Sequence, residues 1–568
     1  MPEQKNFILA MVLMVAILAG FEYFAPTPPA PVPVRSDATI DTTPGPVAAD
    51  PGIAAPTGPR DRNAVLAEGQ RVRIDTPSLS GSLSLHGGRI DDLTLKAYRE
   101  QVDPHSANIV LLNPKGSERP HYAEFGWVSA NPAIKVPGPD AHWQCEGGTL
   151  TENTPVTLVW KNDQGLVFRR VVSVDPDFLF TITDSVENTG PDALTLYPYG
   201  LVSRGYTPRT EGFYILHEGP LGVLDGTLKE ITYQDLRDER HVDYQSTGGW
   251  IGITDKYWLT AIDLPKGDVN KARFVYTGDG HDRYQSDFLG SARTVAPGET
   301  ITTVTDFFAG AKKVDLLDRY AREKGIDRFD LAIDFGWFYF LTKPFFIAIQ
   351  FLYGFLGNFG LAILAFTVAL RLVLYPLANK SYKAMNRMKI LQPKVKELQE
   401  RFQDDRVRMQ QEMMALYRDE KVNPLAGCLP ILIQIPIFFA LYKVLFVALE
   451  MRHAPFYGFI TDLSAPDPTN LFTLFGLIPW NAPSFLHLGI LPIIMGITMW
   501  FQQKLNPAPA DPVQAKVMMF LPVLFTFMLA GFPAGLVIYW AWNNILSIAQ
   551  QWSIMRRHDE APAHAGRT

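Results

Sequence analysis

Apolar and polar positions alternate with a period of two over much of the chain between residues 61 and 330. The segment FLFTITDSV (178–186) shows this alternation, and turn signals such as NDQG (162–165) separate the segments. Such alternation is typical of half-buried antiparallel strands, and a domain of about 270 residues can bury a complete core by itself. We therefore predict a large antiparallel β-sandwich over residues 61–330.

The second half of the chain is dense in Phe, Leu, Ile and Met and carries long apolar runs. A membrane-spanning helix needs about 20 consecutive apolar residues. Together with an apolar N-terminus, these runs predict six spans, the last two joined only by the tight turn GFPAG (531–535). The predicted spans cover residues 1–24, 359–378, 424–449, 488–504, 517–531 and 534–554.

The N-terminal apolar run, from Phe7 to Phe24, leads into a segment rich in proline. Its length fits either an uncleaved anchor or a cleaved secretory signal. No A-x-A cleavage site precedes the next segment, so we favour a transmembrane anchor over residues 1–24. Residues 25–60 contain ten prolines and almost nothing to build a core, which predicts a semi-extended linker.

An aromatic-rich segment, residues 333–358, joins the predicted sandwich to the second predicted span. Pro344 suits the first position of a helix, and Gly357 followed by Asn358 suits its end. Such a helix is short for a span, and Trp and Tyr favour the bilayer interface. We predict an amphipathic helix that lies in the interface, with a buried core helix as the alternative.

Charge sets the predicted orientation of the spans. Residues 380–423 carry eleven Lys and Arg against seven Asp and Glu, whereas in residues 450–487 the one Lys or Arg is Arg452. Loops rich in Lys and Arg stay in the cytoplasm. We therefore place residues 380–423, both termini and the short tail 555–568 inside. The β-sandwich and the loop 450–487 are outside, which in a bacterial inner membrane is the periplasm.

The cytoplasmic segment 380–423 has apolar residues at helical spacing on both sides of Asp404 and Asp405. Met388 to Phe402 and Val407 to Tyr417 each follow this spacing, and the two aspartates supply a break and an N-cap. These features predict an antiparallel helical hairpin.

Several classes of function lack their sequence motifs. The chain has a net charge of −6 and two cysteines, Cys145 and Cys428, which are too few for a thiolate metal site. It contains no G-x-x-x-x-G-K-[ST] phosphate loop, no H-E-x-x-H and no G-x-S-x-G, so it lacks the common signatures of nucleotide, zinc and serine chemistry. We expect no cofactor, no metal, no nucleotide hydrolysis, no enzymatic activity and no nucleic-acid partner.

One basic residue, Arg371, lies inside the apolar run 359–378. At 1.5 Å per helical residue it lies about 18 Å from Phe359 and about 12 Å from Asn379, so snorkelling to the headgroups would be strained. No acid in another predicted span is a convincing partner. Charged residues within a membrane are functional by default, so we favour a water-filled cavity that exposes Arg371 to a visiting molecule, with snorkelling as the alternative.

Other polar residues could line the same cavity. Thr367 precedes Arg371 by one helical turn, Gln434 interrupts the run 424–449, and Tyr539, Trp540 and Asn543 lie in the last predicted span. Taken singly, each is more often a helix-packing residue than part of a site. Lys443 is a second basic residue within an apolar run; we expect it to snorkel outward and assign it no role.

Five segments resemble the YidC membrane protein insertases in their Gram-negative form, within the wider YidC/Oxa/Alb family. They follow the order and spacing of that family through the C-terminal part of the chain. The segments are RLVLYPLANKSY (371–382), MKILQPKVKELQERFQDD (388–405), QQEMMALYRDEKVNPLAGCLPILIQIPIFFALY (410–442), ITDLSAPDP (460–468) and FPAGLVIYW (532–540).

The resemblance implies a polytopic α-helical membrane protein with six transmembrane helices. Five of them form the insertase core with its cytoplasmic hairpin, and a large periplasmic β-supersandwich similar to galactose-mutarotase-like folds is attached. The core holds a hydrophilic groove open to the cytoplasm and to lipid. Arg371 matches the groove arginine, and Thr367, Gln434, Tyr539 and Trp540 match positions that line the groove or meet the substrate.

The implied function is that of an insertase and chaperone for nascent inner-membrane proteins, acting alone or with the Sec translocon (SecYEG and SecDF). Its partners would be nascent chains, membrane lipids and the translocon. The tail after Trp552 is brief, so the ribosome would find only a weak contact there. Residues 471–487 are longer than in the shortest family members, so the resemblance does not define the structure of this loop.

Two alternatives from other classes stay open. A secondary transporter of an anionic solute could use Arg371, although transporters usually carry internal repeats and the sequence shows none. The second alternative is a periplasmic sugar-modifying enzyme on a membrane anchor, because the β fold alone would permit it.

Overall fold

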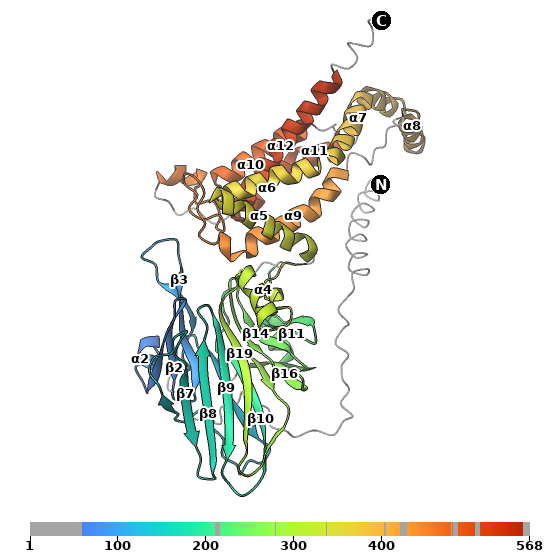
Figure 1. Cartoon of the computed structure of the whole chain (residues 1–568). Coiled ribbons are helices and arrows are strands. Elements are labelled where there is room, and N and C mark those ends of the chain that lie inside the picture. The colour runs from blue at the N-terminus through green and yellow to red at the C-terminus, as the bar shows by residue number, and fades with distance from the viewer. Residues whose placement is uncertain are drawn as a thin grey trace.

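The computed structural model describes residues 60–210, 216–278, 280–336, 338–402, 405–420, 429–478, 480, 487–505 and 512–559. The predicted anchor 1–24, and the predicted linker 25–60 apart from Arg60, lie outside the described residues. Two parts are evident (Figure 1): a β domain, up to residue 332, at one end and a helical part, from residue 333 on, at the other.

The β domain contains nineteen named strands within its described residues. They are β1 Arg71–Asp75, β2 Leu79–Ser84, β3 Arg89–Arg99, β4 Asn108–Leu112, β5 His121–Ser129, β6 Gln144–Glu146, β7 Val156–Lys161, β8 Leu166–Val174, β9 Leu179–Asn188, β10 Leu194–Arg204, β11 Gly219–Leu224, β12 Thr227–Glu230, β13 His241–Ser246, β14 Gly249–Thr254, β15 Trp258–Asp263, β16 Asn270–Thr277, β17 Arg283–Leu289, β18 Arg293–Val295 and β19 Thr300–Ala311.

These strands form two antiparallel sheets, which confirms the predicted sandwich. One sheet runs β1-β2-β3-β5-β10-β17-β16-β13, with β4 beside β3 and β18 beside β10; the other runs β12-β11-β14-β15-β19-β9-β8-β7-β6. Buried and partly buried positions alternate along most of β9, as expected for a strand with one face in the core. Phe125 of one sheet meets Phe307 of the other edge to face, with ring centroids 5.7 Å apart, so aromatic packing joins the sheets.

The named helices are α2 Arg62–Leu66, α3 Tyr233–Glu239, α4 Val314–Glu323, η1 Phe329–Ala332, α5 Tyr339–Leu356, α6 Phe359–Val373, α7 Tyr375–Arg401, α8 Arg406–Asp419, α9 Leu429–Val447, η3 Leu449–Met451, η4 Leu471–Gly476, α10 Ile490–Leu505, α11 Pro512–Met528, η6 Leu529–Gly531 and α12 Ala534–Asp559. In the helical part, α6, α9, α10 and α12 pack together, and α7 with α8 projects away from them (Figure 1).

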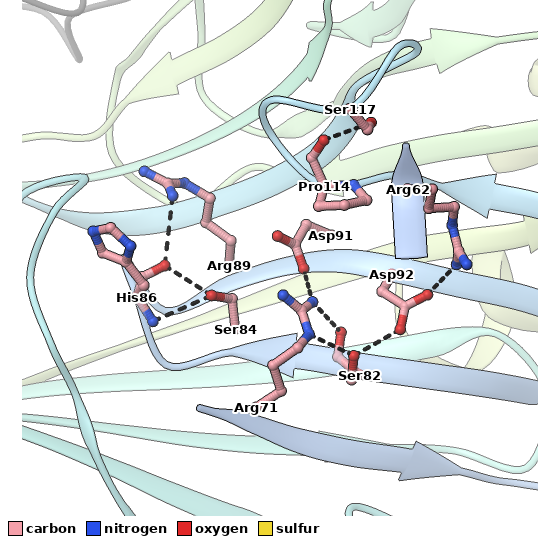
Figure 2. A network of polar contacts seen from close by, with 10 residues as sticks. All are labelled: Arg62, Arg71, Ser82, Ser84, His86, Arg89, Asp91, Asp92, Pro114 and Ser117. Carbon is pink, nitrogen blue, oxygen red and sulfur yellow. Dashed lines mark hydrogen bonds and ion pairs between the residues drawn. The ribbon is translucent and has the colours of Figure 1, made fainter. Parts of the chain in front are cut away.

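A polar network fixes the short helix α2 against the ten-stranded sheet (Figure 2). Arg62 pairs with Asp92 of β3, and the Ser82 hydroxyl of β2 donates to the same carboxylate at 2.6 Å. Arg71 of β1 pairs with Asp91 and donates from Nε to Ser82 Oγ at 2.7 Å. Each of these buried acids already has a guanidinium partner, so the network has a structural role.

The predicted span 359–378 is broken rather than straight. Helix α6 ends at Val373 and α7 begins at Tyr375, and the two axes meet at 63°. Pro376 follows at the second position of α7, where its missing N–H and fixed φ are tolerated. Arg371 therefore lies in the last turn of α6, close to a bend, and the prediction of a continuous helix to residue 378 is wrong.

Helix α5 begins five residues before the predicted start at Pro344. Its end is as predicted, since Gly357 adopts a left-handed φ of 64° as C-cap and Asn358 caps α6 by accepting from Leu361 N at 3.1 Å. Among the described residues, α5 is the one helix long and apolar enough by itself to cross a membrane, and α6 with α7 meets the same requirement as a bent pair. The location of α5 in the bilayer interface stays a prediction.

A helix lies in each of the five described segments predicted as spans: α6, α9, α10, α11 and α12. The turn between the last two is tight, because η6 ends at Gly531 and α12 begins at Ala534. Helices α7 and α8 correspond to the predicted hairpin. Asp405 caps α8 by accepting from Arg408 N at 3.0 Å, and Lys394 pairs with Glu420 at 2.6 Å. The number of spans, six, stays a prediction.

Candidate functional site

Arg371 of α6 is held by the facing side of α12. Its Nε and Nη2 donate to Asn543 Oδ1 at 3.0 and 2.7 Å, and Nη2 also donates to the Asn543 carbonyl at 3.3 Å. The same Nη2 donates to Ser547 Oγ at 2.5 Å. Asn543 and Ser547 are one helical turn apart, so a single face of α12 supplies both partners. One edge of the guanidinium is therefore fixed.

The partners of Arg371 are neutral. Among the described residues, Arg371 forms no ion pair with Asp or Glu, and none of its hydrogen bonds uses Nη1. An amide and a hydroxyl orient a guanidinium without cancelling its charge. Among the described residues, therefore, no acid is paired with this guanidinium and no acceptor is bound to Nη1.

A second polar contact lies beside this arginine. Gln434 Nε2 of α9 donates to the Tyr539 hydroxyl at 2.9 Å, and Tyr539 lies one helical turn before Asn543, the residue that holds Arg371. Tyr539, Asn543 and Ser547 are spaced by four residues, so they form one stripe along α12. Three helices, α6, α9 and α12, thus bring polar groups together.

Thr367 is fully buried one turn before Arg371. Its hydroxyl donates to the carbonyl of Ile363 in its own helix at 2.7 Å, a common arrangement for Thr inside apolar helices. Thr367 was predicted to line the same cavity as Arg371. In the structure the hydrogen bonds to the guanidinium come instead from Asn543 and Ser547 of α12.

Trp540 lies next to Tyr539 in the chain but contacts other groups. Its ring packs against Phe438 of α9 at a centroid distance of 4.6 Å and against Phe525 of α11 at 5.6 Å. Successive residues of a helix point about 100° apart, so Trp540 cannot follow Tyr539 toward Arg371. The structure therefore does not place Trp540 with the Arg371 cluster, and its contact with a substrate stays a prediction.

Sequence reasoning missed Ser547. A signal was present, since Ser547 extends the spacing of Tyr539 and Asn543 by one more turn. A serine inside an apolar helix is more often a packing residue than part of a site, and only the contact with α6 distinguishes it. The indole of Trp542 adds a further link between the helices by donating to the Leu364 carbonyl at 3.3 Å.

The second embedded cation, Lys443 of α9, has a very different partner. Its Nζ lies 2.8 Å from Asp334 Oδ2, with side-chain exposures of 12% and 23%. Asp334 lies between η1 and α5, and it also accepts from the backbone N–H groups of Gly336 and His217 at 3.0 and 3.1 Å. Lys443 was expected to snorkel outward and was assigned no role; in the structure it pairs with an acid from outside its own helix.

Further contacts join the β domain to the outer end of α9. Lys256 lies over the ring of Phe446 at 3.9 Å, and Arg452 donates to the Arg99 carbonyl of β3 at 2.6 Å. The Glu450 carboxyl group lies close to the start of α4, where Lys313 and Asp315 influence its charge. The N-cap of α4, Lys313, provides no side-chain hydrogen bond, so this end of the helix meets the helical part through a buried acid.

Burial raises the pKa of Glu450 to about 7, and the neighbouring Asp315 adds to this effect, while the charge of Lys313 opposes it. The junction between the two parts therefore contains an acid that titrates near neutral pH. We call this set of contacts, which centres on Lys443 and Glu450, the junction.

Among the described residues, no three His, Cys, Asp or Glu side chains are grouped so as to hold a metal ion. Buried ionisable residues of the β domain pair with one another instead. Arg204 holds Asp255 through two bonds of 2.7 Å, and Arg170 holds Asp184 at 2.7 and 3.2 Å. These pairs resemble structural ion pairs rather than a solvent-open acid and base.

The fold and the site define a class: a membrane protein whose apolar helical core holds a cation bound by neutral groups and which carries a separate β-sandwich domain. Residues 351–561 match the family model described as 60Kd inner membrane protein, and residues 71–348 match that of the YidC periplasmic domain. The chain belongs to the YidC family of membrane protein insertases, a family of the inner membrane.

Full-length relatives support this assignment. A protein named "Membrane protein insertase YidC" from Methylobacterium nodulans is 51% identical over 590 residues, covering 98% of this chain and 95% of the relative. One of the same name from Granulibacter bethesdensis is 48% identical over 575 residues, covering 98% of both. A solved YidC insertase structure is 17% identical, with a TM-score of 0.35, and the match covers 84% of this chain and 91% of that one.

Proposed function

We propose that Arg371 is the receptor for the short hydrophilic tail of a nascent membrane protein, within a groove open to the cytoplasm and to lipid. Thr367, Gln434, Tyr539, Trp540 and Asn543 belong to the same proposed groove. Loss of hydration is the main barrier that a polar tail meets on entering a membrane. The guanidinium and its neighbouring polar groups replace part of that hydration.

The observation that carries the proposal is the neutral set of partners around Arg371. Asn543 and Ser547 fix one edge of the guanidinium without cancelling its charge, and in the described part of the chain no acceptor is bound to Nη1, so its donors can serve a ligand. A carboxylate is the ligand that a guanidinium binds most strongly. Clients with acidic tails should therefore gain most from this site.

The free energy for insertion comes from the client in this proposal. Its apolar segment moves along the lipid-facing sides of the predicted spans 424–449 and 517–531 and partitions into the bilayer. Neither a nucleotide nor a cofactor enters the cycle. The protein acts alone or with the Sec translocon, both termini lie in the cytoplasm, and the β domain lies in the periplasm. The family assignment does not favour the transporter alternative.

The test is a pair of substitutions at Arg371, assayed by insertion of a single-span client into proteoliposomes. Arg371→Ala should strongly reduce insertion of a client with an acidic tail, whereas Arg371→Lys, which keeps the charge, should retain most of it. A client that differs only in a neutral tail controls for misfolding, because it should be affected far less. Equal insertion of the acidic-tailed client by Arg371→Ala and the wild type would refute the electrostatic role.

A further inference from the structure

The loop between α9 and α10 exposes several large apolar side chains, some of them aromatic. Among those of its described residues, Leu477 is the most exposed, at 84%. We call six of these exposed side chains together the outer-loop surface: Tyr457, Phe459, Leu474, Leu477, Ile478 and Trp480. Patches of this kind on a protein mark sites of protein or membrane contact.

The β domain provides an internal reference for a surface bathed in water. Among its described residues, the large apolar side chains that are exposed are four valines: Val102, Val110, Val269 and Val304. None of these is aromatic, and they come from more than 200 described residues. The outer-loop surface concentrates more and larger apolar groups in a much shorter segment, so its surroundings differ from those of the β domain.

The loop offers almost no charge to a partner. Between Pro455 and Leu491 the charged residues are Asp462 and Asp467. Asp462 accepts from the backbone of His453 and from Ser464, and Asp467 accepts from Thr469 and, at 2.8 Å, from Leu491 N at the start of α10. Both carboxylates thus stabilise the loop itself, and the outward face is left uncharged.

The loop is attached directly to the ends of two core helices. Leu471 N donates to the Leu488 carbonyl at 2.8 Å, just before α10, and Ala534 N at the start of α12 donates to the Ala465 carbonyl at 2.7 Å. Exposed apolar residues continue onto α10, beginning with Ile494 and Ile497. The outer-loop surface is therefore a continuation of the apolar exterior of the helical core.

We propose that the outer-loop surface is a membrane-contact site that lies in the headgroup and upper acyl region of the outer leaflet. Trp and Tyr prefer this zone because their rings are apolar while their N–H and O–H groups reach water. The absence of outward Lys and Arg implies binding by apolar contact, with no preference for anionic lipid. This inference does not depend on the role proposed for Arg371.

The experiment uses the full chain in nanodiscs of a zwitterionic lipid. In a background that carries Cys145→Ser and Cys428→Ser, an environment-sensitive fluorophore is attached at Leu477→Cys. Val304→Cys, on the β domain at 55% exposure, is the matched aqueous control, and Phe520→Cys, on α11 at 61% exposure, is the matched lipid control. At Leu477 we expect blue-shifted emission relative to Val304, and quenching by lipids labelled near the headgroup.

The depth of the probe distinguishes the outcomes. Emission at Leu477 that is quenched by aqueous iodide and not by labelled lipid, as at Val304, overturns the proposal. Protection from both quenchers also overturns the proposal, because it would show that a second copy or another protein covers the surface. A native-sequence check uses the intrinsic fluorescence: Trp480→Phe should remove a component of the emission that brominated lipids quench, and an unchanged quenched fraction also contradicts membrane contact.

Discussion

Two of the cations in the apolar helices of this protein, Lys443 and Arg371, have opposite kinds of partner. Lys443 of α9 meets an acid, Asp334, at 2.8 Å. Arg371 of α6 meets an amide and a hydroxyl, Asn543 and Ser547, at 2.7 and 2.5 Å. One charge is neutralised where the helical part meets the β domain, and the other is oriented but retained.

The difference teaches that position alone does not make an embedded charge functional. A paired charge contributes to the architecture, because its field is cancelled at short range. Removing either partner leaves the other charge buried without a counter-charge. A charge oriented only by neutral dipoles keeps its field for a ligand. The three predictions below convert the arrangement at Arg371, break the pair at Lys443, or titrate a neighbouring acid of the junction.

The largest effect should come from giving Arg371 the kind of partner that Lys443 has. N543D would place a carboxylate against the guanidinium and cancel the charge that an acidic client tail needs. We expect insertion of an acidic-tailed client to fall by about 100-fold, or about 2.7 kcal/mol. Insertion kinetics in proteoliposomes measure this change.

N543Q is the matched control for this prediction, because it keeps an amide acceptor and adds no charge. It should reduce insertion of the acidic-tailed client much less than N543D. A client with a neutral tail should be inserted by both variants at similar rates. Wild-type insertion of the acidic-tailed client by N543D would show that the charge of Arg371 is not used.

Breaking the paired cation should affect the architecture and not client selection. K443M leaves Asp334 without its ammonium partner, and such losses cost about 3–5 kcal/mol in a fully buried pair. Asp334 is partly exposed and keeps two backbone donors. We therefore expect K443M to lower the free energy of unfolding by about 2 kcal/mol. Thermal unfolding of the whole protein in nanodiscs measures the loss.

Two further variants complete this test. K443M combined with D334N should recover most of the lost stability, since no unpaired charge remains. K394M, at the exposed Lys394–Glu420 pair of the hairpin, should change stability by less than about 1 kcal/mol. A K443M protein whose preference between acidic and neutral tails shifts as in Arg371→Ala would contradict the contrast between the two cations.

The smallest effect concerns pH at the junction. Because the pKa of Glu450 in the folded protein is about 7 and lies above its ordinary value near 4.5, the folded state holds this proton more tightly than the unfolded state. Its stabilising contribution is complete below the ordinary value and is lost as pH rises through about 7. We expect the junction to weaken by about 1–2 kcal/mol over that window.

Hydrogen exchange in the first turn of α4 measures this change, because Glu450 lies close to Lys313 and Asp315 at the start of that helix. Protection should fall between pH 5 and pH 8 in the wild type and stay constant in E450Q. E323Q, at the exposed far end of the same helix, should behave like the wild type. A pH dependence that survives in E450Q would assign the titration to another group.

Features that depend on neighbouring residues were predicted well from the sequence. The alternation in 178–186 corresponds to β9, Gly357 ends α5 in the left-handed conformation, and Asp405 starts α8. These outcomes follow from periodicity and from capping, which act within a few residues. Pro344 misled the prediction of α5, because a proline within the first turns of a helix does not fix which residue comes first.

The sequence by itself determined the division into an alternating β domain and an apolar helical part, and the presence of a cation in each of two apolar runs. Only the tertiary structure decided what those cations meet. Asn543 is 172 residues from Arg371 along the chain, and Asp334 reaches Lys443 from outside its helix. Helical spacing specifies which residues share a face but not which helix that face meets, so the packing of α6 on α12 and of the β domain on α9 made one charge available and neutralised the other.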